Sequence, residues 1–417
     1  MTYHFLSRRR MFLFILLAIL SLASLTPYVY ADTLRVCTYN ALNFRGAADA
    51  DRYDDFRVIF RGIDADIVAL QEIISADAVS GLLSNVFSQV RSDWAAAPFV
   101  NGYDTDNALV YRTSQVAFIS QRAIHTQLRD ITEYLLRPAA PADTSLRLRI
   151  YSLHLKASQG TENEIRRRDE AALLRAQLDV LPAGSLFFVC GDYNVYTSDE
   201  PAYQLLLSSS PNVNGQCFDP INRPGDWNNN SAFAAIHTQS PDASYGGMDD
   251  RFDILLVSGG LMDPAGSRVL PETYTPYGND GRHFNNSINA GTNYAVPDSV
   301  ADALFNGSDH LPVFVDIILQ SESSSAGETS VIPENPGLIR CYPNPFNSTL
   351  TVEIAPLRQA STLDVFDLLG RRVYEMRVPT GAVSPLRLDF SAFGTGPYWI
   401  QLHTPTATHV ARVLLVR

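Results

Sequence analysis

Short apolar runs separated by polar and turn-forming residues are the feature of this 417-residue chain that most restricts its fold. These runs are rich in Val, Ile, Leu, Phe and Tyr, the residues that favour buried β-strands. They predict strands at Leu34–Tyr39, Ile67–Gln71, Ala108–Tyr111, Leu146–Leu155, Leu186–Cys190, Phe252–Val257 and Val313–Leu319. Helical spacing of apolar residues lies between some of them, at Phe56, Ile59, Phe60 and Ile63 and again at Leu174, Leu178 and Leu181. Mixed strands and helices predict an α/β sandwich whose helices lie on the outside.

Residues 1–31 have the three parts of a secretory signal peptide. Three consecutive arginines precede the apolar run Met11–Leu25, and the small residue Ala31 closes the segment. The alternative is a membrane anchor, but the run is shorter than the ~20 residues that cross a bilayer, and Pro27 follows it closely. We therefore expect cleavage after Ala31 and a mature protein with no transmembrane span.

A segment rich in Ser, Gly, Pro and Glu at residues 321–337 predicts a linker. It separates a body at residues 32–320 from a tail at residues 338–417. The tail has β-type runs and no long helical period, so we expect a small C-terminal β-sandwich. Its strands are predicted at Leu350–Ile354, Leu363–Phe366, Leu386–Phe390, Tyr398–Leu402 and Val410–Val416.

The net charge of −12 is distributed unevenly along the chain. Residues 32–320 hold 36 acidic and 21 basic side chains, whereas residues 321–417 hold eight of each. This composition excludes a protein that coats nucleic acid through basic surface, and the hydrophobic content of 46% excludes global disorder. Among the four cysteines, Cys37 and Cys190 lie in apolar runs and Cys341 is far away, so we expect buried thiols with at most one bridge.

Polar side chains recur where the apolar runs end, which is where α/β sheets gather ligands. The candidates are Asn40, Glu72, His154, Asp192, Asn194, Asp253, Asp309 and His310. Carboxylates and amides suit a hard cation such as Mg²⁺, and a histidine with a near-neutral pKa can move a proton. Structural alternatives exist, because Glu72 could cap a helix or pair with an arginine and His154 could be a core histidine with one hydrogen bond. Asp192 and Asn194 are expected on one side of an extended segment.

The ordered motifs TYN, ALQE, NALVYR, SLHLKA, GDYN, RFDILLVS and SDHLPV resemble those of the endonuclease/exonuclease/phosphatase superfamily. These metal-dependent phosphoesterases include deoxyribonuclease-like enzymes and sphingomyelinases. The resemblance covers residues 32–320. It implies a four-layer sandwich of two β-sheets flanked by helices, with a cleft at one edge.

The resemblance also implies a role for each candidate in the metal and phosphate site. Asn40, Glu72 and Asp309 match the neighbourhood of a divalent metal, Mg²⁺ or Mn²⁺. Asp192 and Asn194 match the pair that positions the attacking water and the scissile phosphate.

The two histidines match residues that stabilise charge or transfer protons. His310 resembles the catalytic histidine, oriented by Asp253, and His154 resembles the second histidine of the deoxyribonuclease-like branch. The position two after Asn40 is acidic in the abasic-site repair branch but is Leu42 here, which argues against that branch.

These parts predict a phosphodiesterase, first of all a secreted nuclease acting on DNA or RNA. The acidic body argues against a nuclease, because lysine and arginine supply most affinity for polyphosphates. Lys156, a candidate phosphate ligand, and residues 166–168 form the densest basic stretch, with a solvated helix start as the alternative. A second hypothesis is a phospholipid or small-ester phosphodiesterase, with Trp94–Val100 as an apolar loop beside the cleft. A third is a surface binding protein on a decayed enzyme scaffold.

The tail combines the sequence YPNPF, an LGR turn, a GPY strand and a basic terminus. Together these resemble the C-terminal sorting domain of type IX secretion substrates, although an accessory binding domain is an alternative. The resemblance implies export across an outer membrane through the type IX machinery. The mature protein would then be secreted or attached to the cell surface.

Overall fold

The computed structural model describes residues 31–139, 145–264, 266–320, 339–344, 346–354, 360–367, 371–380, 385–404 and 408–416. The chain forms two compact units that divide between Ser324 and Ser325. The predicted signal peptide, apart from Ala31, and the predicted linker at 321–337 lie outside the described residues.

Two six-stranded sheets form the first unit. The first sheet has the order β11-β12-β1-β2-β4-β3 and the second has the order β5-β6-β7-β8-β10-β9. The strands of the first sheet are β1 (Ala31–Phe44), β2 (Ile67–Ile73), β3 (Trp94–Ala96), β4 (Asp106–Arg112), β11 (Arg268–Pro276) and β12 (Val313–Gln320). Those of the second are β5 (Val116–Ile124), β6 (Ile131–Pro138), β7 (Leu148–His154), β8 (Leu186–Asp192), β9 (Cys217–Phe218) and β10 (Asp253–Ser258).

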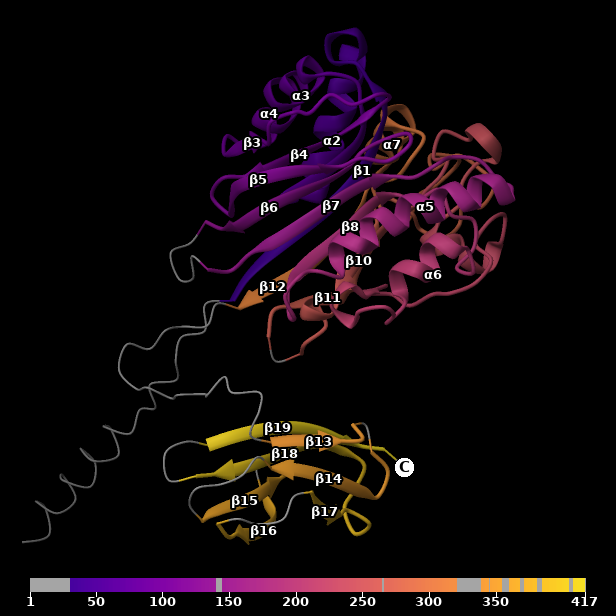
Figure 1. Cartoon of the computed structure of the whole chain (residues 1–417). Coiled ribbons are helices and arrows are strands. Elements are labelled where there is room, and N and C mark those ends of the chain that lie inside the picture. The colour runs from indigo at the N-terminus through magenta and orange to yellow at the C-terminus, as the bar shows by residue number, and fades with distance from the viewer. Residues whose placement is uncertain are drawn as a thin grey trace, which may run out of the picture. The chain divides into compact units, whose positions relative to one another are not determined.

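Helices cover both outer faces of this pair of sheets, as Figure 1 shows. The helices on the first sheet are α2 (Tyr53–Ile63), α3 (Ala76–Leu82), α4 (Ser88–Val90) and α7 (Asp298–Gly307). Those on the second are α5 (Thr161–Leu178) and α6 (Pro201–Leu207). Three apolar layers result, one between the sheets and one beneath each set of helices. The predicted four-layer α/β sandwich is confirmed.

Each of the seven predicted strands of the body coincides with an observed strand, and five lie wholly within one. The other two were predicted too long, because β7 is shorter than Leu146–Leu155 at both ends and β10 begins one residue after Phe252. Five observed strands were not predicted. Two of these, β5 and β11, expose much of one face, so their sequences lack a continuous apolar run. The apolar spacing of Leu174, Leu178 and Leu181 predicted a helix that reaches Leu181, but α5 ends at Leu178. The segment Trp94–Val100, proposed as an exposed apolar loop beside the cleft, is only partly a loop. Trp94 is buried in β3 and packs on Phe87, whereas Pro98 and Val100 lie beyond this strand and are exposed.

One end of the sandwich collects the polar strand ends. Within the second sheet, the register places His154 of β7 opposite Asp192 of β8, and Asp192 opposite Asp253 of β10. Gly191, in the GDYN motif, allows this close pairing. A side chain there would meet the Leu153 carbonyl oxygen, and its φ of 137° is one that residues other than glycine rarely adopt.

The second unit is a small β-sandwich, as predicted. Its sheets have the orders β13-β14-β17 and β16-β15-β18-β19. Their strands are β13 (Ile339–Tyr342), β14 (Thr349–Ile354), β15 (Ser361–Phe366), β16 (Arg372–Val378), β17 (Leu386–Asp389), β18 (Gly396–His403) and β19 (Thr408–Leu415). One apolar core contains residues of both sheets, among them Leu350 and Ile400.

All four cysteines are free thiols, in agreement with the sequence analysis. Cys37, Cys190 and Cys217 are buried, and Cys341 is half-buried. Among the helices of the described residues, none has the length and the apolar character needed to cross a bilayer.

A buried ion pair anchors the chain just before β10. The Arg251 guanidinium donates to both carboxylate oxygens of Asp219, at 2.8 and 3.1 Å, and lies over the Trp227 ring. Both charged side chains are almost completely inaccessible to solvent. Burial alone would raise the pKa of the Asp219 carboxyl, but Arg251 outweighs it and lowers that pKa.

Replacing Asp219 with Asn should lower the free energy of unfolding of the first unit by about 3–5 kcal/mol, because Arg251 would stay buried without a counter-charge. Since the folded-state pKa of Asp219 is lowered, the difference from wild type should be complete above about pH 4. It should shrink as the pH falls through the lowered pKa. Urea denaturation at a series of pH values measures this difference.

Asp64→Asn is the matched control, because Asp64 pairs with Arg91 in an ion pair that is half-exposed on both sides. This change should alter stability by less than about 1 kcal/mol. Equal losses in the two variants would show that burial of the Asp219 pair does not set its contribution.

Candidate active site

The polar strand ends line a cleft of about 490 Å³ at one end of the first unit. Six of the eight residues predicted from the sequence lie on its walls, namely Glu72, His154, Asp192, Asn194, Asp309 and His310. The other two, Asn40 and Asp253, are buried directly behind and contact the lining residues. Strand ends from both sheets therefore meet in one place.

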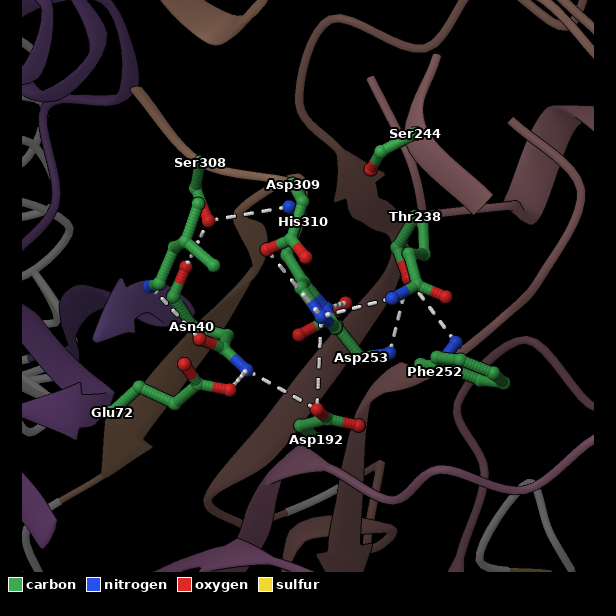
Figure 2. A network of polar contacts seen from close by, with 12 residues as sticks. Asn40, Glu72, Asp192, Thr238, Ser244, Phe252, Asp253, Ser308, Asp309 and His310 are labelled. Atoms are coloured by element: carbon green, nitrogen blue, oxygen red, sulfur yellow. Dashed lines mark hydrogen bonds and ion pairs between the residues drawn. The ribbon is translucent and has the colours of Figure 1, made fainter. Parts of the chain in front are cut away.

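His310 and Asp253 form a short contact across the two sheets (Figure 2). His310 Nδ1 lies 2.7 Å from Asp253 Oδ2, so the other ring nitrogen faces the cleft. There Nε2 lies 3.7 Å from Asp192 Oδ2 and 3.9 Å from Asp309 Oδ1. Burial disfavours the charged ring, but the carboxylates of Asp253 and Asp192 outweigh it and raise the pKa of His310 well above its usual value. The contact with Asp253 thus gives His310 one fixed orientation, and the nearby carboxylates favour its protonated ring.

Asn40 connects two carboxylates that come from opposite sheets. Its amide Nδ2 donates to Glu72 Oε1 at 3.0 Å and to Asp192 Oδ2 at 3.1 Å (Figure 2). The Asn40 side-chain oxygen accepts from the Leu42 backbone N–H at 3.0 Å, which fixes the amide. Glu72 and Asp192 are therefore held close together.

Backbone irregularity aims Glu72 into the cleft. The pairing of β2 with β4 shifts register between Leu70 and Ile73, and Glu72 itself has a φ of 58°. A bulge of this kind turns a side chain out of the strand's alternation. A left-handed backbone at a residue other than glycine is a strained conformation, and such residues cluster at functional sites. The Asn43 N–H donates to Glu72 Oε2 at 2.8 Å and holds the side chain in place.

Glu72, His154 and Asp192 offer ligand atoms that all lie within 4.8 Å of one another. Two polar atoms of the same region, His154 Nδ1 and Asp309 Oδ1, are buried and have no hydrogen-bond partner in the part of the chain that the structure describes. Burial, with Arg129 and His310 nearby, lowers the pKa of His154 well below its usual value and so favours the neutral ring that ligates metals. Burial also raises the pKa of Asp192 to about 7. Gathered carboxylates and orphaned atoms of this kind fit a divalent cation.

The structure alters two details of the predicted site. The close group of ligand atoms contains His154 and Asp192 together with Glu72, whereas Asp309 lies on the His310 side. Asn194 is not on an extended segment as expected, because β8 ends at Asp192 and Asn194 has a φ of 51°. Its amide donates to the Leu155 carbonyl at 3.3 Å, which ties the turn to the end of β7.

In the basic stretch at residues 166–168, the expected solvated helix start is wrong for the central residue, Arg167. This side chain acts as a clamp, here meaning that it holds residues 156–158 against α5. Arg167 is fully buried and pairs with Glu200 at 2.8 Å. It also donates to the carbonyls of Lys156 and Ser158, at 2.8 and 2.9 Å. Residues 157–159 line the cleft, so Arg167 fixes one of its walls.

The Lys156 side chain does not line the cleft. Its Nζ donates instead to the Ala157 carbonyl at 2.7 Å. Its backbone N–H donates to Glu170, a second contact from α5 to this wall.

Several lining residues were not found from the sequence. Arg129 supplies the cationic side chain of the cleft, held by Asp104 and Thr105 at 3.1 and 3.2 Å. Gln239 places its Nε2 3.4 Å from His310 Nε2. Both lie in irregular segments that carry no motif or period, so no sequence signal points to them.

Comparison with known proteins agrees with this architecture. The sequence profile of the Endonuclease/Exonuclease/phosphatase family matches residues 37–310. The chain belongs to this family. Its members are hydrolytic phosphoesterases that depend on divalent metals, and the group around Glu72 offers a site for such an ion.

The tail of this family member matches a second profile, that of the secretion system C-terminal sorting domain, over residues 340–416. The sorting domain marks the chain for type IX export and for a secreted or surface location. No curated protein sequence matches the chain significantly.

Solved structures with a similar fold cover about two thirds of the chain. Truncated TDP2 of Caenorhabditis elegans is 18% identical, with a TM-score of 0.43 and coverage of 68% of this chain and 97% of that one. TDP2 of D. rerio, complexed with single strand DNA product, is 14% identical, with a TM-score of 0.47 and coverage of 69% and 99%. An endonuclease/exonuclease/phosphatase family protein of Bacteroides thetaiotaomicron is 17% identical, with a TM-score of 0.42 and coverage of 69% and 98%.

Arg167→Lys should lower kcat/KM for a phosphodiester by about 10- to 100-fold, because small displacements of positioning groups have effects of this size. A lysine keeps a charge beside Glu200 but lacks the planar fork that donates to Glu200 and two carbonyls at once. Hydrolysis of bis(p-nitrophenyl) phosphate and thermal unfolding should be measured in parallel.

Arg168→Lys is the matched control, since Arg168 is half-exposed and pairs with its neighbour Asp169. It should keep kcat/KM within about 2-fold of wild type, as expected for an exposed pair. If both variants lost activity equally, the clamp on residues 156–158 would not be the cause.

Proposed function

We propose that this protein is a divalent-metal-dependent phosphodiesterase whose active site is the cleft at the end of the two-sheet sandwich. The observation that carries the proposal is the convergence of Asp253, His310 and Asp192 with Glu72 and His154 in one buried group. A general acid, an oriented carboxylate and a metal site are the parts that in-line attack of water on a phosphate ester requires.

His310 is the residue proposed to act on the transferring phosphoryl group. Asp253 fixes its tautomer through Nδ1, so that Nε2–H points into the cleft. A protonated ring there stabilises charge that develops on a phosphoryl oxygen or donates a proton to the leaving oxygen. Asp192, at 3.7 Å from Nε2, is placed to accept a hydrogen bond from the attacking water, with Asn194 beside it.

The residues proposed to hold Mg²⁺ or Mn²⁺ are Glu72, Asn40 and Asp309. The grouped ligand atoms of Glu72, His154 and Asp192 add His154 and Asp192 to these candidates. Such an ion, when bound, polarises the phosphoryl oxygen and stabilises the leaving oxygen. Asn40 positions the Glu72 and Asp192 carboxylates by donating to both.

The proposed substrate is the phosphodiester backbone of extracellular nucleic acid. A family of phosphoesterases and an export signal are consistent with a secreted nuclease. The second candidate is a phospholipid or small-ester phosphodiesterase, and it is favoured by the acidic side chains that outnumber the single arginine on the cleft wall. Hydrolysis assays with plasmid DNA, RNA, sphingomyelin and a chromogenic diester distinguish the two.

His310→Ala should reduce kcat for bis(p-nitrophenyl) phosphate by about 10²- to 10⁴-fold, the range for removal of a positioned acid–base group. EDTA should abolish turnover, and added Mg²⁺ or Mn²⁺ should restore it. Initial rates with and without metal, for wild type and variant, make the test.

His125→Ala is the control, since this ring is exposed and lies outside the cleft. It should keep the wild-type rate. Equal rates for wild type and His310→Ala, or no turnover with any metal, would contradict the proposal and favour a binding protein on an inactive scaffold.

Arg129→Met should raise KM for a phosphodiester by about 10-fold, as loss of one charge-assisted hydrogen bond predicts. Lys156→Met tests the cation proposed from the sequence in the same way. Because Lys156 Nζ is directed at a backbone carbonyl, we expect the smaller change in KM from Lys156→Met. Steady-state kinetics of the two variants side by side measure this, and a larger effect at Lys156 would reverse the assignment.

A further inference from the structure

The walls of the cleft carry few of the charges that bind a nucleic-acid backbone. Among the residues that the structure describes, those that line it include one arginine, Arg129, and no lysine. Five lining residues are acidic, namely Glu72, Asp192, Asp249, Asp250 and Asp309. Release of counterions by lysine and arginine supplies most of the affinity of proteins for duplex DNA. A nucleic acid in this cleft therefore gains little affinity from lysine and arginine, and other contacts must add to it.

An exposed aromatic ring stands on the wall of the same cleft. Tyr245 is one of the lining residues, and 84% of its surface is accessible to solvent. The phenol ring of Tyr245 lies outside the four apolar clusters of the protein. A large apolar ring kept in water beside a reactive centre is a feature of ligand contact more than of packing.

The loop that carries Tyr245 begins and ends beside His310. The Gln239 side chain lies 3.4 Å from His310. The Gln239 backbone carbonyl accepts from the Asp249 N–H at 2.8 Å, and this hydrogen bond closes the loop of residues 240–248. Tyr245 itself lines the same cleft as Asp309 and His310. The ring is thus attached close to the reacting groups through a short, closed segment.

This loop is held in one conformation by its own hydrogen bonds. Ser244 donates from both its backbone and its hydroxyl to Asp242 Oδ1, at 2.9 and 2.7 Å. Ser240 N–H donates to the Gly247 carbonyl, and the Gly247 N–H to the Ser244 carbonyl, at 2.7 and 3.0 Å. Tyr245 has a φ of 50°, a left-handed backbone that side chains other than glycine adopt with strain. A fixed loop presents the ring at low conformational-entropy cost to a ligand.

From these observations we propose that Tyr245 is a stacking platform for an unpaired base next to the scissile phosphate, and that the substrate is single-stranded nucleic acid. The inference rests on the proposed phosphodiesterase function and specifies its substrate class. Base–aromatic stacking tolerates any sequence and supports binding where few phosphates are neutralised. In a duplex the faces of the bases are covered by neighbouring base pairs. Except at its ends, a duplex therefore has no base that could stack on Tyr245.

A competing occupant of the same ring is a quaternary ammonium group, such as that of a phosphocholine diester. An aromatic face with carboxylates nearby binds such cations. The ring and the acidic wall would then serve a lipid headgroup. Binding of such a headgroup to Tyr245 in place of a base would overturn the proposal.

The test compares two oligomers of equal length on the full-length protein with Mg²⁺ or Mn²⁺. One is single-stranded DNA, and the other is a tetrahydrofuran oligomer that has the same phosphates but no bases. The quantity measured is the ratio of kcat/KM for DNA to kcat/KM for the oligomer without bases. The ratio should be well above one for wild type and should fall by about 5- to 150-fold in Tyr245→Ala, the range expected for one lost stacking contact. Tyr245→Trp should keep it.

Tyr294→Ala is the matched control, because Tyr294 is also exposed but lies outside the cleft with Arg282 over its ring. It should keep the wild-type ratio. KM for the DNA oligomer should also depend weakly on salt, with a log–log slope near the value of about 0.7 that one phosphate contact on a single strand gives.

Three results would overturn the stacking proposal while leaving the phosphodiesterase intact. They are equal rates on the two oligomers, faster cleavage of duplex than of single strands, or a preference for a phosphocholine diester that Tyr245→Ala removes. If no diester at all is hydrolysed, the proposed function fails. The stacking role of Tyr245 can then be tested by binding alone, from the affinities of wild type and Tyr245→Ala for a labelled DNA oligomer. Equal affinities would reject this role.

Discussion

Face-to-face packing of the two sheets is the constraint on which the rest of this structure depends. The apolar layer between them holds strands from distant parts of the sequence at a fixed separation, and every cross-sheet contact of the cleft relies on that spacing. Asp253 of the second sheet meets His310, which precedes β12 of the first, at 2.7 Å. Asn40 of the first sheet reaches Asp192 of the second at 3.1 Å. A shift of one sheet by an ångström would break both contacts.

A buried polar network extends the same connection below the cleft. Gln71 donates to the Ser152 hydroxyl at 2.9 Å, which in turn donates to Asn107, so that the two sheets are joined by side chains as well as by apolar packing. Burial makes such contacts strong when they are satisfied and expensive when they are not. The site itself leaves atoms unsatisfied and holds Glu72 in a strained backbone, a concentration of unfavourable features that a bound cation and substrate would relieve.

The sequence predicted the fold class and eight of the polar residues in or directly behind the cleft, because both depend on local pattern. Apolar runs predict buried strands, and polar residues at their ends mark the edge of a sheet. The strands it missed, such as β5, expose one face and lack a continuous apolar run. Arg167 was misread for a related reason: a helix rich in charge predicts a solvated face, yet this guanidinium is buried against Glu200 and two carbonyls that are remote in sequence.

The sequence by itself therefore determined most of the buried strands, the tail motifs, the acidic charge of the body and the chemical types of the site residues. Only the tertiary structure decided which of them meet. In the folded protein His154 and Asp192 lie close to Glu72, and the Lys156 side chain does not line the cleft. Arg129, Gln239 and Tyr245, which come from irregular segments, do line it. The physical reason is that local pattern depends on near neighbours along the chain, whereas these contacts depend on how two sheets and their loops pack in space.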